Sequence, residues 1–465
     1  MSPFDRSAFA TTNGPIIRTI LPARRTEIVT SYSNDVDAAL DEQAARFDVP
    51  RTHAIRFELA QRWANAPRPL TAVYLFERDA THAFVTDRPL DVPGAGHFHA
   101  TAKRCHAAIF SFEQPLTLAP VTIVKPWGRE HWYTGIEARG TSGVTDGRCT
   151  SPLSWVLAAA PRRLCGDAPL PLLKVLDPAP ESVLGDLYFE LHDTKQELYV
   201  VTRIDRRAWP DGCGAIRLGM NAARRAKYAD DQRFRAAYLV AVRKYEAVRR
   251  TIDGLLDEKR AAAGVQLDVP VPPVLMQRWL DELDPRLIEA ERTGRATMDE
   301  FTGMRALREG DIVQLPCGLP HALQHGVRVI EVQTPTFERR IVSFAQKVLT
   351  QDHWDTESAV KHMRLDCPAP SEPRAFITEH DCTVERIGEF DRFGTRRVRL
   401  APEAHLTLPA DLPYAVCIGI SGELSLGNAR IGPETACLVP GSATQRTLTN
   451  IGNADAVCLL SGPNL

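Results

Sequence analysis

Short apolar runs broken by Gly, Pro and Asp dominate the second quarter of the chain. Between residues 121 and 204 these runs are VTIVKPWG, PLLKVLD, GDLYFELH and ELYVVTRI. Runs of this length, bounded by turn-forming residues, predict β-strands. The same texture resumes at Gly310 with DIVQLPCG and VRVIEVQTP and continues to Leu349. We therefore expect a barrel or sandwich that is built from two separated parts of the chain.

A helical pattern lies between these two parts. Apolar residues recur three and four positions apart at Phe234, Tyr238, Ala241, Tyr245, Val248, Ile252 and Leu255. This spacing predicts a long amphipathic helix. A second helix is expected over 274–293, after the VPVPP punctuation. Residues 217–300 are thus predicted to form a helical insertion within the β region.

The two ends of the chain have different patterns. Residues 1–120 combine a helical stretch at 35–47 with the strand-like runs LTAVYLFE and HAAIFSFE, which predicts an α+β extension whose role the sequence does not indicate. After the polar link CPAPSEPRAF, residues 370–465 give short strands with turns at SGELSLGN and VPGSA. We expect a second barrel there, without metal because no histidine lies near its turns.

Composition and charge exclude several classes of protein. The 465 residues are 44% hydrophobic, enough for two to four domains. A formal charge of -2 gives no broad basic field, which disfavours nucleic-acid binding. The chain has no apolar run of membrane-spanning length and no continuous apolar stretch near its start, so we expect a cytoplasmic location and no membrane association. The ten cysteines form no CxxC pair, so other side chains must hold any metal.

The segment GDLYFELHDTKQELYVV, which starts at Gly185, contains three candidate metal ligands. Residues two apart on a strand share a face, so Glu190 and His192 can converge on one point. Glu197 begins the next run, ELYVV, and a tight HDTK turn could fold that run back beside the first. The sequence therefore predicts a hairpin that supplies all three ligands.

A second segment, GDIVQLPCGLPHALQH, supplies the fourth candidate ligand. Gly310, Pro316, Gly318 and His321 follow the spacing G-x5-P-x-G-x2-H of the second cupin motif, while His325 stands where that motif usually has Asn. Gly and Pro would shape a corner that directs the imidazole of His321 into a barrel. A single histidine of this kind is more often a buried core residue, but the partner segment favours a ligand.

Two imidazoles and two carboxylates suit one divalent ion, with Zn²⁺ the first expectation and Mn²⁺, Fe²⁺ or Co²⁺ as alternatives. A second candidate is the HxH pair of His97 and His99. No carboxylate follows that pair at a supporting spacing, and its Gly- and Pro-rich setting is more typical of a loop.

These residues resemble the type I phosphomannose isomerase family of metal-dependent cupins. The likeness begins at KPWG (125–128), passes through PLLKVLD, and reaches the metal segment, where the family has Gln-x-His and later Lys-x-Glu. The resemblance implies a mainly β fold with two cupin (jelly-roll) barrels in tandem. The expected domains are an N-terminal extension at 1–120, a metal-binding barrel at 121–216 and 301–350, the helical insertion at 217–300, and a metal-free barrel at 370–465.

The chain departs from the family pattern at three places. Glu190 replaces a neutral Gln, which adds negative charge at the metal and weakens its Lewis acidity. The HDTK turn is shorter than the family's loop. In VRVIEVQTPTFERRIVSF the gap from Glu331 to Arg340 is one residue short, and Ser343-Phe344 replaces the family's Asp-Trp.

The resemblance implies an isomerase that interconverts an aldose phosphate and a ketose phosphate, of the mannose 6-phosphate and fructose 6-phosphate type. Glu331 would then shuttle a proton, and Lys195 and Arg340 would stabilise negative charge or hold phosphate. Lys174 could reach the same pocket, as could Arg339 if the strand register slips by one residue. The alternatives are a solvated turn lysine for Lys195, a surface salt bridge for Arg340 and a buried ion pair for Lys174.

Two other functions stay open on the sequence. One is a metal cupin of different chemistry, such as an oxygenase or epimerase. The other is a carbohydrate-binding protein that has lost catalysis. The expected partner is a small-molecule sugar phosphate. A homodimer is an open alternative for the oligomeric state.

Overall fold

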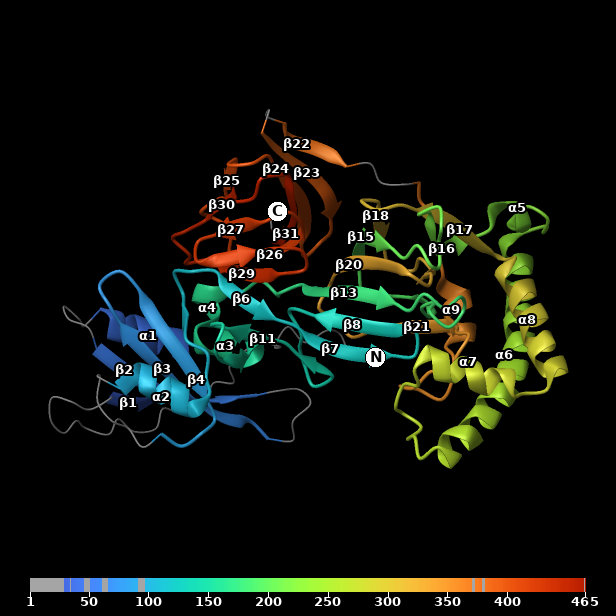
Figure 1. The fold of residues 1–465 in the computed structure, drawn as a ribbon, viewed down its shortest axis with the longest axis horizontal. Coiled ribbons are helices and arrows are strands. Elements are labelled where there is room, and N and C mark those ends of the chain that lie inside the picture. Colours follow the sequence, from blue (N-terminus) through green and yellow to red (C-terminus); the bar gives the residue numbers. More distant parts are fainter. Residues whose placement is uncertain are drawn as a thin grey trace. The chain divides into compact units, whose positions relative to one another are not determined.

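The computed structural model describes residues 29–33, 35–45, 51–60, 66–90, 97–369, 373–378, 381–463 and 465. The chain divides into two compact units. The first comprises Met1–Val121, Trp132–Pro171 and Pro373–Leu465, and the second comprises Thr122–His131 and Leu172–Glu372. The fold is mainly β, and Figure 1 shows the strands of each unit as arrows.

Two sheets form the second unit. The six-stranded sheet has the order β18 (Ile312–Leu315), β15 (Glu197–Ile204), β20 (Val327–Gln333), β13 (Leu172–Pro178), β8 (Gly128–Trp132) and β7 (Val121–Lys125). The five-stranded sheet has the order β17 (Thr302–Leu307), β16 (Gly214–Met220), β19 (His321–Leu323), β14 (Phe189–Leu191) and β21 (Arg340–Ser343). Strands β15 and β13 both run antiparallel to β20, and β14 runs antiparallel to β19 and β21.

Both sheets contribute to one hydrophobic core. Tyr199 and Val329 come from the six-stranded sheet, and Ile216, Leu323 and Ile341 from the five-stranded sheet. Side chains two positions apart on a strand share a face, so the residues two positions from these core residues point into the same interior. This arrangement lets polar residues from both sheets meet.

The segment between Leu191 and Glu197 connects the two sheets instead of closing a hairpin. Strand β14 pairs with β19 and β21, whereas β15 pairs with β18 and β20. The predicted hairpin is therefore wrong. The physical reason lies in the turn, where the N–H groups of Asp193 and Thr194 donate to the carboxylate of Glu338. This contact comes from a distant part of the chain and has no local signal.

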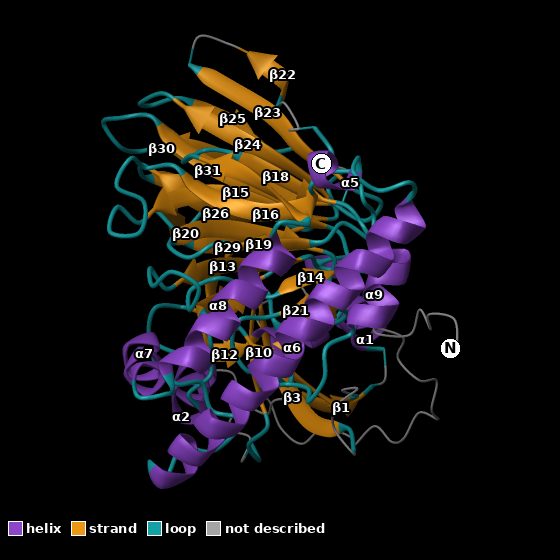
Figure 2. Ribbon diagram, turned by 90° about the vertical axis from the view of Figure 1, so that its right-hand side faces the viewer, coloured by secondary structure: helices purple, strands orange, loops and turns teal. Residues whose placement is uncertain are grey.

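Four helices follow β16 and precede β17: α5 (Ala222–Arg225), α6 (Asp231–Ala262), α7 (Pro273–Asp281) and α8 (Pro285–Asp299). Helix α6 agrees with the predicted amphipathic helix, since its apolar stripe, including Phe234, Tyr238 and Ile252, is buried. Figure 2 shows α6 and α8 running side by side. A shorter helix, α9 (Thr356–His362), packs against β21 and α6.

The single helix predicted over 274–293 is wrong, because the structure places a break before Pro285. Proline has no N–H to donate within a helix and is favoured in the first turn. Asp284 caps the new helix by accepting a hydrogen bond from the Arg286 N–H at 2.8 Å. The Asp-Pro pair is therefore a start signal, and α8 begins there.

In the first unit, a five-stranded sheet has the order β1 (Val29–Tyr32), β2 (Arg51–Leu59), β3 (Arg68–Phe76), β4 (Thr81–Thr86) and β5 (Phe110–Ser111). The run LTAVYLFE falls on β3, as expected. Within HAAIFSFE only Phe110–Ser111 is a strand, because His106 adopts a left-handed conformation that ends α2 (Phe98–Cys105). The helix predicted over 35–47 corresponds to α1 (Val36–Ala44), and residues 46 and 47 lie outside the described part.

The rest of the first unit contains a nine-stranded sheet and a four-stranded sheet that share a core including Val398, Cys417 and Leu448. The order of the larger sheet is β12 (Thr150–Pro152), β11 (Gly143–Thr145), β6 (Leu116–Ala119), β29 (Ala436–Pro440), β26 (Tyr414–Ser421), β31 (Ala456–Gly462), β24 (Gly394–Leu400), β23 (Cys382–Glu389) and β22 (Arg374–Thr378). The smaller has the order β25 (His405–Thr407), β30 (Thr447–Asn450), β27 (Leu424–Leu426) and β28 (Ala429–Ile431).

The remaining elements of the first unit are a small sheet of β9 (Ile136–Glu137) and β10 (Gly140–Thr141) and two short helices, α3 (Leu153–Ala159) and α4 (Pro161–Leu164). Among the helices of the described ranges, none has the length and apolar character needed to cross a bilayer.

Candidate metal centre

Two of the predicted ligands are direct neighbours across strands β14 and β19. Glu190 and His321 are Cα partners in this antiparallel pair, although they are 131 positions apart in the sequence. His192 follows β14 immediately, two residues after Glu190. One donor atom from each of these three residues lies within 4.8 Å of the others. Among the described residues, this is the one grouping of His, Cys, Asp or Glu that meets this test.

The three donor atoms have the properties that metal ligands require. Glu190 Oε2, His192 Nε2 and His321 Nε2 are buried, and none has a hydrogen-bond partner among the described residues. Both histidines are only 2% exposed. A buried polar atom without a hydrogen bond costs free energy, and an ion at their meeting point would remove that cost for all three. The residues present therefore fit a divalent metal.

The opposite nitrogens of the two imidazoles fix their orientation. His192 Nδ1 lies 3.0 Å from the main-chain oxygen of Glu338, and His321 Nδ1 lies 2.9 Å from that of Leu319. A carbonyl oxygen only accepts, so each Nδ1 must carry a proton, and in the neutral imidazole this leaves the Nε2 lone pair available to a metal. Burial, followed by the positive charge of Lys195, also lowers the pKa of His192 and favours its neutral form.

Glu197 lies beside both imidazoles. Its Oε1 is 3.3 Å from His192 Nε2, and its Oε2 is 3.2 Å from His321 Nε2. Lys195 Nζ approaches Glu197 Oε1 at 2.6 Å. Burial raises the pKa of Glu197, but the positive charge of Lys195, the next largest influence, opposes this effect. The pKa of Glu197 therefore lies well below its ordinary value, and the group is a carboxylate. A fourth ligand role for Glu197 remains a prediction. Lys195 is buried and is not a solvated turn lysine.

The Pro-Gly corner supports His192 from a second side. Gly318 has φ +77°, a left-handed conformation that costs glycine little. In this conformation its N–H donates to the main-chain oxygen of His192 at 2.7 Å. The motif G-x5-P-x-G-x2-H thus does more than present His321, because its second glycine also holds the neighbouring candidate ligand, His192.

A buried ion pair lies on the same inner face of the six-stranded sheet. Lys174 and Glu331 are Cα partners on β13 and β20, and Nζ lies 3.2 Å from Oε2. Lys174 also donates to Gln333 at 2.7 Å and lies 3.9 Å from Glu130. Burial is the main reason that the pKa of Glu331 is raised to about 8, with Lys174 opposing the shift and Glu197 adding to it. This carboxyl can therefore exchange a proton near neutral pH.

Sequence reasoning missed three polar residues of this interior. Gln333 lies two positions after Glu331, and Tyr199 two positions after Glu197, so strand alternation could have identified both. The Tyr199 hydroxyl donates to Glu197 Oε2 at 3.1 Å. Glu130 has no comparable signal, because β8 is distant in the sequence from the predicted motifs.

The two adjacent arginines have different partners. Arg340 donates through Nε to both carboxylate oxygens of Asp193, at 3.0 and 2.8 Å, and through Nη1 to Ser358 at 3.0 Å. Arg339 Nη1 lies 3.8 Å from Glu190 Oε2, and its guanidinium stacks over the Tyr188 ring at 4.7 Å. Arg339 is therefore the one of the pair that contacts a candidate ligand. The substrate roles of both remain predictions.

The histidine pair outside this centre has a different setting. His97 directly precedes α2, and His99 lies in its first turn. Both side chains are exposed. Within the described residues, neither histidine belongs to a group of three or more potential metal ligands.

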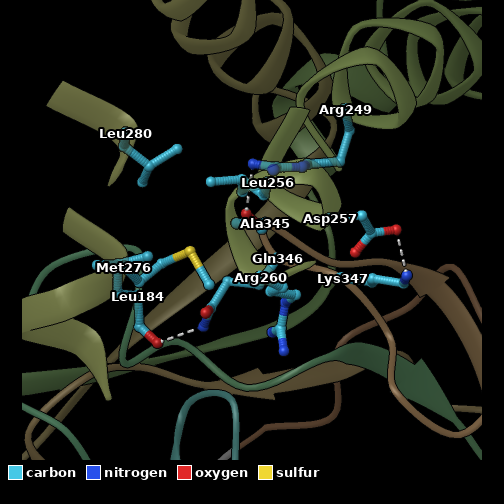
Figure 3. A pocket seen from close by; sticks show the side chains of 10 residues that line it. All are labelled: Leu184, Arg249, Leu256, Asp257, Arg260, Met276, Leu280, Ala345, Gln346 and Lys347. Atoms are coloured by element: carbon cyan, nitrogen blue, oxygen red, sulfur yellow. Dashed lines mark hydrogen bonds and ion pairs between the residues drawn. The ribbon is translucent and has the colours of Figure 1, made fainter. Parts of the chain in front are cut away.

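A small pocket lies elsewhere in the second unit. It is lined by Leu184, Arg249, Leu256, Asp257, Arg260, Met276, Leu280, Ala345, Gln346 and Lys347 (Figure 3). Within it, the amide of Gln346 donates to the main-chain oxygen of Leu184 at 2.7 Å, and Lys347 pairs with Asp257 at 2.6 Å. The pocket contains none of the predicted site residues. The hydrogen bond from Gln346 holds Leu184, the residue just before the segment that contains Glu190 and His192.

Comparison with known proteins establishes the fold. No protein-family model and no curated protein sequence matches this chain. Among solved structures, mannose 6-phosphate isomerase from Bacillus subtilis matches 75% of this chain and 99% of its own, with a TM-score of 0.51 and 14% identity. The apo form of mannose 6-phosphate isomerase from Salmonella typhimurium matches 76% of this chain and 100% of its own, with the same TM-score and identity. The chain is thus similar in fold to the type I mannose 6-phosphate isomerases, which are cupins, as the sequence predicted.

Proposed function

We propose that this protein is a metal-dependent isomerase that interconverts an aldose phosphate and a ketose phosphate, of the mannose 6-phosphate and fructose 6-phosphate type. The observation that carries the proposal is the meeting of Glu190, His192 and His321 within 4.8 Å. Their donor atoms are buried and lack hydrogen bonds from the described residues. The fold likeness to isomerases agrees with this chemistry.

The donor set favours Zn²⁺, with Mn²⁺, Fe²⁺ and Co²⁺ as alternatives. Glu190, His192 and His321 would hold the ion, and Glu197 would complete the set. When bound, the ion would polarise the oxygens at C1 and C2 of the sugar. We also propose that the two sheets of the second unit form a cupin barrel of jelly-roll type with α5–α8 as an insertion, and that the nine- and four-stranded sheets form the tandem partner barrel without metal.

The proton transfer is assigned to Glu331. Because its pKa of about 8 lies close to neutral pH, the carboxyl can both take a proton and give it back. In the aldose-to-ketose direction it would remove the proton from C2 and return it to C1. Lys174, 3.2 Å away, would stabilise the charged carboxylate, and Lys195 would stabilise charge on the substrate oxygens. Arg339 and Arg340 are the cations proposed to hold phosphate.

An isotope experiment tests this assignment. Purified protein loaded separately with each of the four metals would be incubated with mannose 6-phosphate and fructose 6-phosphate in heavy water. Interconversion with deuterium incorporated at C1 or C2 supports isomerisation by proton transfer. Glu331→Gln should abolish both the turnover and the exchange, because an amide cannot take the proton. Absence of turnover with every hexose and pentose phosphate would remove the proposal.

One observation favours a second candidate function. Two histidines and one carboxylate, the grouping seen here, also hold Fe²⁺ in oxygenases. Oxygen uptake by the iron-loaded protein, without isomerisation, would select that chemistry. Sugar binding without turnover, unaffected by Glu331→Gln, would instead indicate a binding protein. A cytoplasmic location and a homodimer remain proposals.

A further inference from the structure

Glu338, which precedes β21, contacts the segment after Leu191 through both its side chain and its main chain. Its Oε1 and Oε2 each accept from the N–H of Asp193 at 2.9 Å, and Oε2 accepts from the N–H of Thr194 at 3.0 Å. Its main-chain oxygen lies 3.0 Å from His192 Nδ1. A single residue thus binds a metal-ligand imidazole and the two N–H groups that follow it.

Arg340 strengthens this attachment from two residues further along. Its guanidinium binds the Asp193 carboxylate through Nε at 3.0 and 2.8 Å and through Nη2. Asp193 is therefore held at its main-chain N–H by the Glu338 carboxylate and at its side chain by the Arg340 guanidinium. Two residues at the start of β21, Glu338 just before it and Arg340 within it, thus both bind the turn after His192.

We propose that Glu338 is a positioning residue for the metal centre: its carboxylate holds the Asp193–Thr194 turn so that its own carbonyl fixes the imidazole of His192. This inference rests on the metal dependence in the proposed function. Glu338 is not one of the three residues whose donor atoms would hold the proposed ion. It acts through His192, whose Nε2 faces the other two donor atoms.

The physical argument has two steps. Hydrogen bonds to an ionised carboxylate are stronger than those between neutral groups, so the turn is held more firmly by Glu338 than water would hold it. A fixed acceptor on Nδ1 selects the tautomer with a free Nε2 and raises its basicity. Loss of such an outer partner typically lowers metal affinity by about 10- to 100-fold.

The test compares Glu338→Ala, Glu338→Gln and Glu338→Asp with a matched control, Glu246→Gln. Glu246 lies on α6, is 27% exposed, and is paired with Arg250 at 2.8 Å, so its substitution also removes a half-buried paired carboxylate. Zinc affinity would be measured by competition with a fluorescent chelator, and ligand geometry by the visible absorption of the Co²⁺-loaded protein.

We expect Glu338→Ala to bind zinc about 10- to 100-fold more weakly and to change the Co²⁺ spectrum. Glu338→Gln should lose less, because one amide oxygen still accepts, and the control should match the parent protein. The unfolding temperature of the metal-free protein shows whether each variant folds. The Gln and Asp variants keep the test decisive if the Ala variant does not fold.

Unchanged zinc affinity and an unchanged Co²⁺ spectrum in the folded Glu338 variants would overturn the inference, as would an equal loss in the control. A parent protein that binds no metal would also overturn it. Failure of the isomerase proposal has a different signature, because the parent would bind zinc in a Glu338-dependent way yet convert no sugar phosphate.

Discussion

Lys174 and Glu331 lie directly opposite each other on β13 and β20, and 3.2 Å separates Nζ from Oε2. The two side chains are only 10% and 3% exposed. A buried pair of this kind is costly to break, since removal of one partner leaves the other charge without compensation. The pair therefore links the stability of the second unit to its proposed chemistry.

Lys174→Met should destabilise the protein by about 3–5 kcal/mol when Glu331 is ionised. The double variant Lys174→Met/Glu331→Gln should be less destabilised than Lys174→Met alone, because it leaves no buried charge uncompensated. Urea unfolding of the metal-free proteins measures both effects. A double variant that loses the full sum of the two single losses would contradict a direct interaction.

The pH dependence of stability should reflect the raised pKa of Glu331. Between the ordinary pKa of 4.5 and the folded value of about 8, the folded state keeps a proton that the unfolded chain has lost. Stability from this group is therefore lost as pH rises through that interval. The unfolding free energy of the metal-free protein should fall more steeply with pH than that of Glu331→Gln. Equal slopes would show that Glu331 titrates normally.

Removal of either imidazole should eliminate the bound metal. His192→Ala and His321→Ala are expected to contain no stoichiometric transition metal by elemental analysis, because each change removes a buried donor atom. His353→Ala is the control, since that histidine is 67% exposed and paired with Asp352. A bound metal stabilises the folded state by about 2.7 kcal/mol at 100 times its dissociation constant, so chelation should lower the unfolding temperature of the parent and control but not of the two variants. Retention of metal by both variants would reject the site.

Glu190→Gln should separate affinity from reactivity. The amide keeps an oxygen donor and removes one negative charge from the ligand set. We expect weaker metal binding and a higher turnover per bound ion, because a less negative ligand set leaves a stronger Lewis acid. Turnover would be normalised to the metal content of each preparation. Slower turnover per ion would show that the charge of Glu190 assists the reaction, and tighter binding would contradict the expected loss of affinity.

Several features could be predicted from local sequence because their cause is local. The period of the apolar residues predicted α6, since one face of any helix with that pattern must be buried. Strand alternation placed Glu190 and His192 on one side, and the Gly and Pro spacing identified His321 at a corner. Each inference depends only on residues within one element or turn.

Contacts between distant segments decided the rest. Strand pairing between distant segments brings Glu190 opposite His321 and places Glu197 in the other sheet. Long-range contacts also let Glu338 and Arg340 bind the turn after His192. The sequence by itself determined which side chains could bind a metal and which faces they share. Only the tertiary structure decided which of them meet, because hydrogen bonding between strands carries no signal in the sequence near either partner.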